Sequence, residues 1–361
     1  MNRIFNFSAG PCTLPVPALQ SAADEFMDYQ GKGMSIIEMS HRSKEYDAVH
    51  AEAMDLVKRL YGVPDNYKVL FLGGGATLQF SMIPMNLMLP GGHCDLTLTG
   101  AWSKKAMADA KKIGTVNLAY DGSDEKFMNL PDPATLKPSE GSSYFHVTSN
   151  ETIGGVQWKS FPETGDVPLV CDMSSDFVSR RVDVSKFGLI YAGAQKNAGP
   201  AGTSIVILRE DLLERSSDKL TAYLSYATHA PKDSMYNTPP VFAIYMVMKT
   251  LKWLEDKGGL EAAEKMAAER AGLIYGAMAK NPEFYSCPVN EKCRSLMNIV
   301  WRLPSEELEK KFVAEALENG MSGLKGHRSV GGCRASVYNA MPVEGAKALA
   351  EFMDAFAAKN G

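Results

Sequence analysis

The sequence predicts an α/β protein with two domains: a large one on a mostly parallel, helix-covered, seven-stranded sheet, and a smaller α+β one at the C-terminal end. Two observations lead to this prediction. Between residues 69 and 209, short apolar runs alternate with helix-length or looped segments, which is typical of parallel sheets covered on both faces. From about residue 260, the expected order becomes helix, strand, helix, strand, helix, which indicates a separate α+β unit.

Two amphipathic helices are expected before the sheet. Residues 13–29 and 43–62 both carry apolar side chains at helical spacing. The second segment stops at Gly62, and Pro64 follows, which is a common way for a helix to end.

The seven expected strands are short and apolar, and they follow one another along the chain. Helices are expected between the first three, over residues 76–88 and 101–114. The strands are "KVLFLGGG", "CDLTLTG", "TVNLAYD", "SYFHVTSN", "PLVCDMS", "FGLIYAGA" and "TSIVILR".

A long helix after residue 238 is expected to connect the two domains. Thr238 is expected to cap it, with Pro239 and Pro240 in its first turn. Further on, helices are expected at 260–280, 305–319 and 343–359, and strands at 295–303 and 333–341. We therefore divide the chain into an N-terminal segment (1–15), a large domain (16–258) and a small domain (259–361).

The composition argues against large charged partners. The 361 residues include 38 basic and 42 acidic side chains, for a net charge of −4, with no long block of one sign. We therefore expect neither nucleic acid nor a membrane surface as a partner. The N-terminal "MNRIFNFSAGP" lacks the apolar stretch of a secretion signal, so a cytoplasmic protein is expected. Six cysteines without a Cys-x-x-Cys pair suggest neither a disulfide framework nor a metal site.

A glycine-rich turn follows the first expected strand. In "FLGGGATLQF", Gly73 to Gly75 lead directly into a helix, so free backbone amides and the positive end of the helix dipole face one point. Such a turn can cradle a phosphate, although three glycines also suit any tight strand-to-helix turn. No Gly-Lys-Ser/Thr follows, so this is not a P-loop.

An acid and an amine end two consecutive expected strands. Asp172 ends "PLVCDMS", and Lys196 follows "FGLIYAGA". Either could simply face water, but neighbouring strand ends would bring both to one pocket together with the glycine turn. A partly desolvated lysine can attack a carbonyl to form a Schiff base. Pyridoxal 5′-phosphate would use all three features: its aldehyde needs the lysine, its ring nitrogen the acid, and its phosphate the turn.

Eight motifs, in order, carry a family resemblance along nearly the whole chain. They are "FNFSAGP", "GGGAT", "GAWSKKA", "TSNETIGG", "CDMSSDF", "YAGAQKNAGPAG", "MYNTPP" and "GHRSVGGCRAS". Through them the sequence resembles the phosphoserine aminotransferases, a family of fold-type I pyridoxal-phosphate enzymes. The resemblance implies reversible amino transfer between L-glutamate and 3-phosphohydroxypyruvate. It also permits 4-phosphohydroxy-L-threonine, an intermediate of pyridoxine biosynthesis, as a further substrate.

The resemblance implies a cofactor-binding set. Lys196 would form the Schiff base and later move a proton, and Asp172 would hold a proton on the ring nitrogen. Trp102 would stack on the ring, and Thr152 would hydrogen-bond the ring oxygen. The phosphate would be held by Ala76, Thr77 and Gln195, and by Asn237 and Thr238 of a neighbouring subunit, which implies a homodimer with shared active sites.

Five cationic residues would hold the substrates by resemblance. Arginine's planar fork suits phosphate and carboxylate oxygens. Arg334 would bind the α-carboxylate, and the distal anion would be bound by His41 and Arg42 of one subunit and by His327 and Arg328 of the other. Two positions depart from some relatives: Thr77 replaces an arginine, and Ala9 a serine.

Three alternatives stay open at this point. A cysteine desulfurase-like lyase would share Lys196 and Asp172, but it would need a reactive cysteine on a mobile loop. A nicotinamide-dependent oxidoreductase would need a spaced Gly-x-Gly-x-x-Gly and a later ribose-binding acid, and neither is evident. A non-catalytic anion-binding protein would leave a strand-end lysine facing an acid unexplained.

Overall fold

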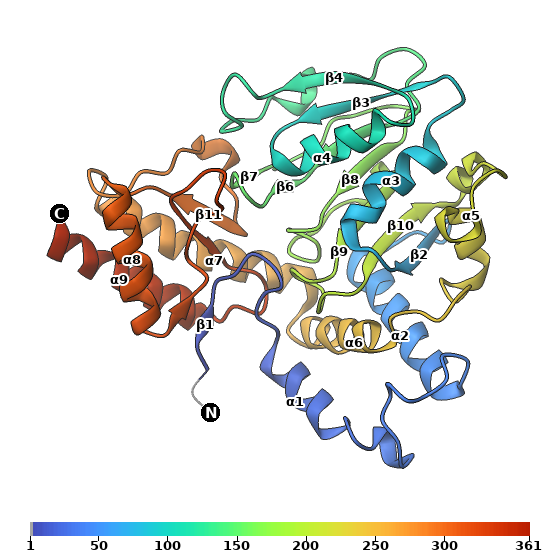
Figure 1. The fold of residues 1–361 in the computed structure, drawn as a ribbon, viewed down its shortest axis with the longest axis horizontal. Helices are drawn as coiled ribbons and strands as arrows, with labels where there is room; N and C mark the ends of the chain where they lie inside the picture. The colour runs from blue at the N-terminus through green and yellow to red at the C-terminus, as the bar shows by residue number, and fades with distance from the viewer. Residues whose placement is uncertain (1–2) are drawn as a thin grey trace.

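A computed structural model describes residues 3–361 and contains the expected seven-stranded sheet (Figure 1). The strand order is β2-β10-β9-β8-β5-β3-β4. β10 runs antiparallel to both of its neighbours, and the other neighbouring pairs are parallel. The predicted fold class is therefore confirmed. The strands are β2 (Tyr67–Leu72), β3 (His93–Leu98), β4 (Thr115–Asp121), β5 (Phe145–Thr148), β8 (Leu169–Asp172), β9 (Leu189–Gly193) and β10 (Ser204–Arg209).

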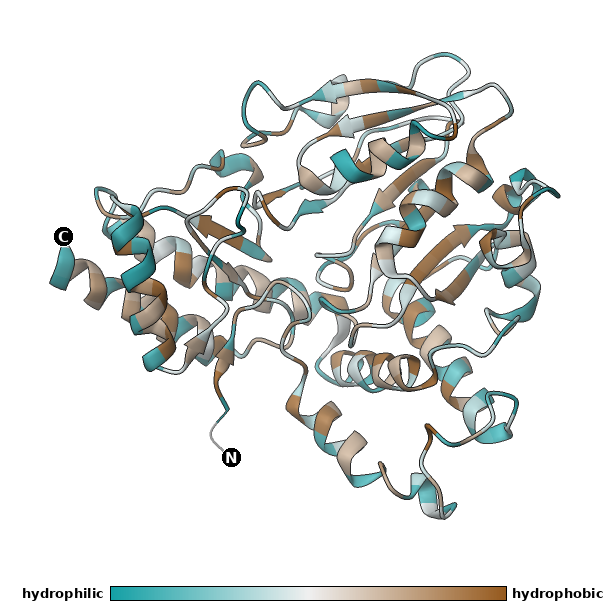
Figure 2. Cartoon of the chain, viewed as in Figure 1, coloured by the Kyte–Doolittle hydropathy of each residue, from teal (hydrophilic) through white to brown (hydrophobic). Residues whose placement is uncertain are grey.

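Helices cover both faces of this sheet, as the continuous apolar strands predict. Val69 and Phe71 of β2 point into one core, which α2 (Lys44–Tyr61) and α6 (Val241–Asp256) complete. Leu70 and Leu72 point the other way, into a second core under α3 (Gly75–Leu87) and α4 (Ala101–Ala110). Figure 2 shows the strands of the sheet as predominantly hydrophobic ribbons.

The two N-terminal helices differ in how well their lengths were predicted. α2 has the expected extent, because Ser43 caps its start and Gly62 ends it in the left-handed conformation. α1 covers only Val16–Asp24 of the expected 13–29. Residues 25–28 form a turn and bends instead, and a 3₁₀ turn follows at Tyr29–Gly31, with Gln30 and Gly31 at positive φ.

The expected cap of the long connecting helix was wrong. α6 begins at Val241 after Pro240, and no side chain caps it. A capping hydroxyl on Thr238 would need the amide of the second or third residue after it. Pro240 has no amide N–H, and the amide of Val241 already donates to the backbone oxygen of Pro239 at 2.8 Å.

The C-terminal part of the chain has a core of its own. It contains α7 (Gly259–Lys280), α8 (Glu306–Glu318) and α9 (Val343–Asn360), and the antiparallel pair β11 (Asn298–Trp301) and β13 (Cys333–Ser336). Both strands are shorter than expected. The core of this part of the chain includes Trp301, Phe312 and Phe356. The domain limits at 15 and 258 stay a prediction.

Two short pairings were not foreseen from the sequence. β1 (Phe5–Asn6) runs parallel to β12 (Met321–Ser322), and this places the fully buried Phe7 in the C-terminal core. β6 (Asn150–Glu151) pairs with β7 (Val156–Gln157) in a small hairpin beside the sheet. Two-residue strands leave no periodic pattern in a sequence, which is why neither was predicted.

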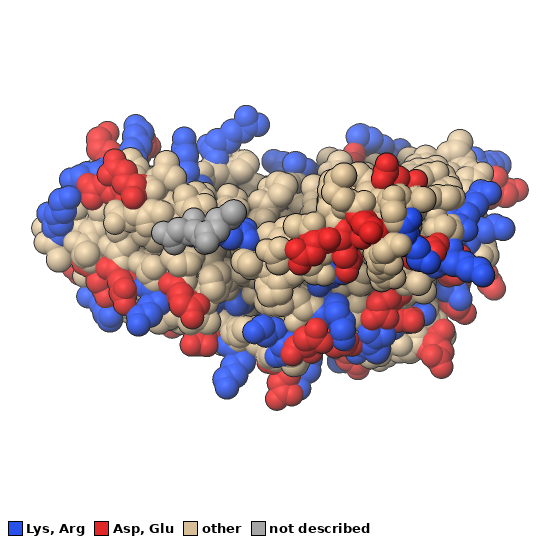
Figure 3. All heavy atoms as spheres, turned by 90° about the horizontal axis from the view of Figure 1, so that it is seen from below, with Lys and Arg blue, Asp and Glu red and all other residues tan. Residues whose placement is uncertain are grey.

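The described surface carries charges of both signs. Figure 3 shows basic and acidic side chains interspersed on one face, in keeping with the small net charge of −4. None of the helices between residues 3 and 361 combines the length and the apolar character needed to cross a bilayer.

Candidate active site

Lys196 lies just beyond β9, where the chain leaves the sheet. Its side chain is 9% exposed, and its Nζ donates a 2.7 Å hydrogen bond to Thr152 Oγ1. Burial lowers the pKa of Lys196 to about 8, against the opposing attraction of Asp172 and Glu151. A far larger fraction of this amine is therefore neutral at physiological pH than of an ordinary lysine.

Asp172 ends β8, the strand beside β9. The two strands are parallel, with Asp172 paired to Tyr191, so their carboxyl ends reach the same edge of the sheet. Asp172 is buried, and its Oδ1 accepts a 2.8 Å hydrogen bond from the amide of Ser174. Burial raises the pKa of Asp172, and the positive charge of Lys196 opposes that rise. The acid and the amine stabilise each other's charged forms.

One cavity of about 380 Å³ joins the features that the sequence singled out. Its wall includes the acid, the amine and the glycine turn. The residues that line it are Gly10, Pro11, Gly74, Gly75, Ala76, Thr77, Trp102, Asp172, Ser174, Gln195, Lys196, Ala201 and Gly202.

The glycine turn opens into this cavity at the start of α3. Gly74 and Gly75 adopt positive φ values of 79° and 60°. A Cβ atom on Gly74 would lie 2.5 Å from Cβ of Leu78, so the turn requires glycine at that position. No side chain caps α3, and the amides of its first turn, including those of Ala76 and Thr77, have no acceptor within the helix. These amides suit an anion.

Trp102 forms another wall of the cavity. Its ring centroid lies 5.3 Å from Nζ of Lys196. The indole Nε1 is buried and has no hydrogen-bond partner among the described residues. The ring therefore has one face near the lysine, and its N–H group is left for a bound molecule or water.

Two of the predicted substrate-binding cations lie close to these residues. Arg334, on β13, donates through Nη1 to the backbone oxygen of Thr152 at 3.3 Å, and its buried Nε has no described partner. The pKa of His327 is lowered by burial, and further by the positive charges of Arg334, Arg328 and Lys105. The positive charges of Arg334, Arg328 and Lys105 thus all act on one histidine, His327.

The family model of the class-V aminotransferases matches residues 4–349 of this chain. The chain belongs to the class-V aminotransferases. Within this class it belongs to the phosphoserine aminotransferase family, because full-length relatives of that name are about half identical to it. The relative from Geobacillus kaustophilus is 52% identical over 356 residues, and that from Lysinibacillus sphaericus 50% over 358 residues; each match covers 99% of both proteins.

Solved structures of phosphoserine aminotransferases share the fold throughout. The Bacillus circulans subsp. alkalophilus structure has a TM-score of 0.98 at 50% identity, covering 99% of both chains. The Trichomonas vaginalis structure, described as bound to pyridoxal phosphate, has a TM-score of 0.92 at 40% identity, covering 97% of this chain and 99% of that one. A further phosphoserine aminotransferase structure, with a TM-score of 0.97 at 46% identity, is described as containing a Schiff base.

Eight predicted residues of this aminotransferase do not line the cavity. Four of them are Thr152, His327, Arg328 and Arg334, and the other four are His41, Arg42, Asn237 and Thr238. Arg42, Asn237 and Thr238 are exposed, and His41 is half-buried with an unpartnered Nε2. The resemblance assigns them to the site of a neighbouring subunit, so a single chain is expected to leave them outside its own cavity. Their roles stay a prediction.

One residue at the aminotransferase site was missed from the sequence. Glu151 is fully buried and accepts hydrogen bonds from the amides of Trp102 and Ser103, at 3.0 and 2.9 Å, and from the Ser103 hydroxyl at 2.8 Å. It thereby fixes the first turn of α4, which carries Trp102. One signal in the sequence was available: α4 begins after Gly100, which has no side chain to cap the helix, so an acceptor from elsewhere in the chain is needed.

The structure does not support the alternative of a lyase, which would need a reactive cysteine on a mobile loop. Cys333 lies within β13 and is 1% exposed, and burial raises the pKa of its thiol. A buried thiol on a strand is protonated and cannot reach a ligand in the cavity as a mobile loop cysteine could.

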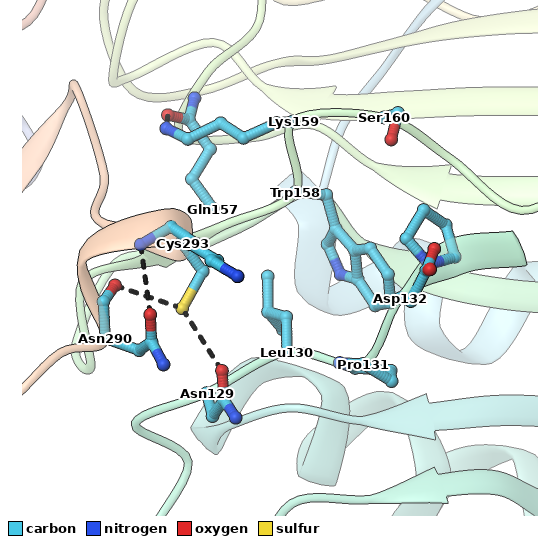
Figure 4. Close-up of a pocket in the computed structure, with 12 residues that line it drawn as sticks. Asn129, Leu130, Pro131, Asp132, Gln157, Trp158, Lys159, Ser160, Asn290 and Cys293 are labelled. Carbon is cyan, nitrogen blue, oxygen red and sulfur yellow. Dashed lines mark hydrogen bonds between the residues drawn. The ribbon is translucent and has the colours of Figure 1, made fainter. Parts of the chain in front are cut away.

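A second cavity, of about 440 Å³, shares no lining residue with the one that contains Lys196, and Figure 4 shows residues of its wall. It is formed by three segments, at residues 129–133, 157–160 and 290–293. Lys159, on its wall, already donates to Gln157 Oε1 and to the backbone oxygen of Arg294. None of the predicted site residues lines it.

Proposed function

We propose that this chain is a pyridoxal-phosphate-dependent phosphoserine aminotransferase. It transfers an amino group reversibly between L-glutamate and 3-phosphohydroxypyruvate, giving O-phospho-L-serine and 2-oxoglutarate in serine biosynthesis. The observation that carries the proposal is the single cavity that contains the amine of Lys196, the carboxylate of Asp172 and the open first turn of α3. Relatives of this name, about half identical over their full length, support the choice of substrates.

The residues present fit the cofactor's three reactive parts. The amides of Ala76 and Thr77, with the side chain of Gln195, suit its phosphate, because no side chain caps the start of α3. The turn before these amides has room only for glycine at position 74. Lys196 supplies an amine that burial makes more nucleophilic near neutral pH. Trp102 offers a ring face for stacking.

Bound pyridoxal phosphate supplies an aldehyde for an amine and an electron-poor ring that accepts the electron pair left when the substrate's α-carbon loses a proton. Asp172 would hold a proton on the ring nitrogen, because a cationic partner stabilises a buried carboxylate. The Nζ of Lys196 would act as the acid/base that moves the proton of the substrate's α-carbon. Thr152 keeps Nζ on the cavity side of β9 through their hydrogen bond.

Cations orient the substrate around this centre. Arg334 is held by the backbone of Thr152 and keeps a free Nε, so it suits the α-carboxylate common to both amino acids. His327 feels the positive charges of Arg328 and Arg334, and with Arg328 it suits the distal phosphate or carboxylate. One set of cations therefore serves both half-reactions in turn.

A second copy of the chain completes the site in this proposal. His41, Arg42, Asn237 and Thr238 reach the partner's cavity in a homodimer. Exposed apolar side chains flank them: Met34 and Ile37 precede the His-Arg pair, and Tyr236 precedes Asn237. Burial of such side chains against a partner is favourable, and scattered apolar exposure beside site residues is typical of an interface.

Three finer assignments complete the proposal. The enzyme acts in the cytoplasm on small anionic metabolites, with neither nucleic acid nor a membrane as a partner. It requires no metal. 4-Phosphohydroxy-L-threonine shares a distal phosphate and an α-carboxylate with phosphoserine and is a second amino acid that the enzyme forms with glutamate as donor, so the enzyme also serves pyridoxine biosynthesis.

An activity assay tests the proposal. The holoenzyme is incubated with L-glutamate and 3-phosphohydroxypyruvate, and 2-oxoglutarate is measured; pyruvate and oxaloacetate, which lack the phosphate, serve as matched acceptors. We expect formation of 2-oxoglutarate only with the phosphorylated acceptor, and none with the Lys196→Ala variant. Equal turnover of the unphosphorylated acids would refute the substrate assignment.

A further inference from the structure

Lys105 is an exposed lysine whose side chain folds back over the ring of Trp102, a residue of the cavity wall. Lys105 lies one helical turn after Trp102 on α4, so the two side chains share a face of the helix. Nζ of Lys105 lies 4.3 Å from the centroid of the Trp102 ring, within the range of a cation–π contact. A four-carbon side chain that folds over this ring is held near the site.

No carboxylate neutralises this ammonium group. None of the ion pairs within residues 3–361 includes Lys105, although the side chain is exposed and free to reach one. The neighbouring Lys104 is also exposed but has no contact with the Trp102 ring. Of these two adjacent lysines, only Lys105 is drawn to the indole.

The charge of Lys105 acts on the same residue as two predicted substrate-binding arginines. The pKa of His327 is lowered by burial first, and then by Arg334, Arg328 and Lys105. Arg334 is bonded to Thr152, and Thr152 to Lys196, while Lys105 and Lys196 share the Trp102 ring as a neighbour. These contacts place Lys105 at the edge of the group formed by His327, Arg328 and Arg334.

We infer that Lys105 is a further substrate-binding residue, whose ammonium group binds the distal phosphate of the substrate together with His327 and Arg328. This inference rests on the proposed function. Like charges held close together repel one another, and an anion bound among them removes that cost. A phosphate with two negative charges gains more from an added cation than a carboxylate with one, so Lys105 favours the phosphorylated substrate over glutamate.

The effect is expected to be moderate, because the ammonium group is exposed to water and salt screens it. We expect Lys105→Ala to raise KM for 3-phosphohydroxypyruvate about fivefold at low ionic strength. KM for glutamate and kcat should stay within about twofold of the wild type, and the difference should shrink as salt is added.

The test compares Lys105→Ala with Lys104→Ala, its neighbour on the same helix, and with Lys105→Arg. Steady-state kinetics give KM for each substrate at low and high salt, and calorimetry gives the affinity of the holoenzyme for inorganic phosphate. We expect only Lys105→Ala to weaken phosphate binding and raise KM for the phosphorylated substrate, and Lys105→Arg to restore both.

Two results would overturn the inference. One is a Lys105→Ala enzyme that matches Lys104→Ala in KM and in phosphate affinity. The other is a Lys105→Ala enzyme with altered kcat and cofactor affinity but unchanged phosphate affinity, which would show that the lysine only supports the Trp102 ring. If the wild type does not turn over phosphorylated acids, the proposed function fails, but the phosphate titration still decides the role of Lys105.

Discussion

The amine of Lys196 and the hydroxyl of Thr152 are joined by a 2.7 Å hydrogen bond, although 44 positions separate them in the sequence. The backbone oxygen of Thr152 also accepts a hydrogen bond from Arg334. A single residue after β6 therefore contacts both the proposed Schiff-base lysine and the arginine proposed to hold the substrate's carboxylate. In the proposed reaction, Thr152 would therefore fix the position of the amine relative to the arginine that holds the carboxylate.

The reactivity of Lys196 should reflect its lowered pKa. The neutral amine is the nucleophile, and its fraction rises with pH until the pH exceeds the pKa. With a pKa of about 8 rather than the ordinary 10.5, the rate at which the cofactor-free protein captures pyridoxal phosphate should rise up to about pH 8 and then level off. Stopped-flow absorbance across pH 6 to 10 measures it; a rate still climbing tenfold per unit at pH 10 would contradict this pKa.

Asp172 should matter for turnover more than for cofactor capture. Asp172→Asn keeps the size of the side chain but removes the charge that holds a proton on the ring nitrogen. We expect the variant still to bind pyridoxal phosphate, while kcat falls by about a hundredfold or more. Single-turnover kinetics with O-phospho-L-serine measure the loss, and a near-normal rate would exclude this role.

Glu151 should stabilise the protein and position Trp102. Replacing Glu151 by Ala leaves two amides and a hydroxyl of the first turn of α4 without their buried acceptor. We expect the free energy of unfolding of the cofactor-free protein to fall by about 1–3 kcal/mol, and the fluorescence of Trp102 to change. Glu283→Ala, at an exposed glutamate, is the matched control for urea unfolding, and equal stability of the two variants would refute the prediction.

A mixture of two inactive variants tests the shared active sites. Lys196→Ala lacks the amine, and Arg42→Ala lacks the cation proposed to reach the partner's site. In a mixed dimer, one of the two sites combines an intact Lys196 with an intact Arg42 from the other subunit. Unfolding and refolding an equal mixture should therefore restore about a quarter of wild-type activity above that of either variant. No gain over the separate variants would place both residues in one subunit's site.

Much of the fold was predictable from local patterns. The seven strands of the sheet and the extent of α2 follow from apolar runs and from the Ser43 and Gly62 signals, all of which are local in sequence. The missed features have two kinds of cause, a distant partner for β1 and a local proline for the start of α6. β1 forms only because β12 lies beside it, and the missing cap at α6 reflects a proline two residues after Thr238.

The part of the candidate site at the ends of β8 and β9 was predictable from the sequence. Asp172 and Lys196 end neighbouring parallel strands, so a shared cavity follows from topology. Glu151 was missed because its role arises from a contact across the fold: it accepts from a helix start 48 or 49 positions earlier. The contact of Lys105 with Trp102 is local, but helical spacing alone does not show that this side chain folds over the ring.

The covalent role of Lys196 is tested most directly by trapping. The cofactor-free protein is mixed with pyridoxal phosphate, reduced with borohydride, digested and mapped by mass spectrometry, with Lys196→Ala treated in parallel. We predict one modified peptide, labelled at Lys196, and no stoichiometric label in the variant. Stoichiometric labelling of another lysine, or an unlabelled Lys196 in protein that has bound the cofactor, would contradict the account.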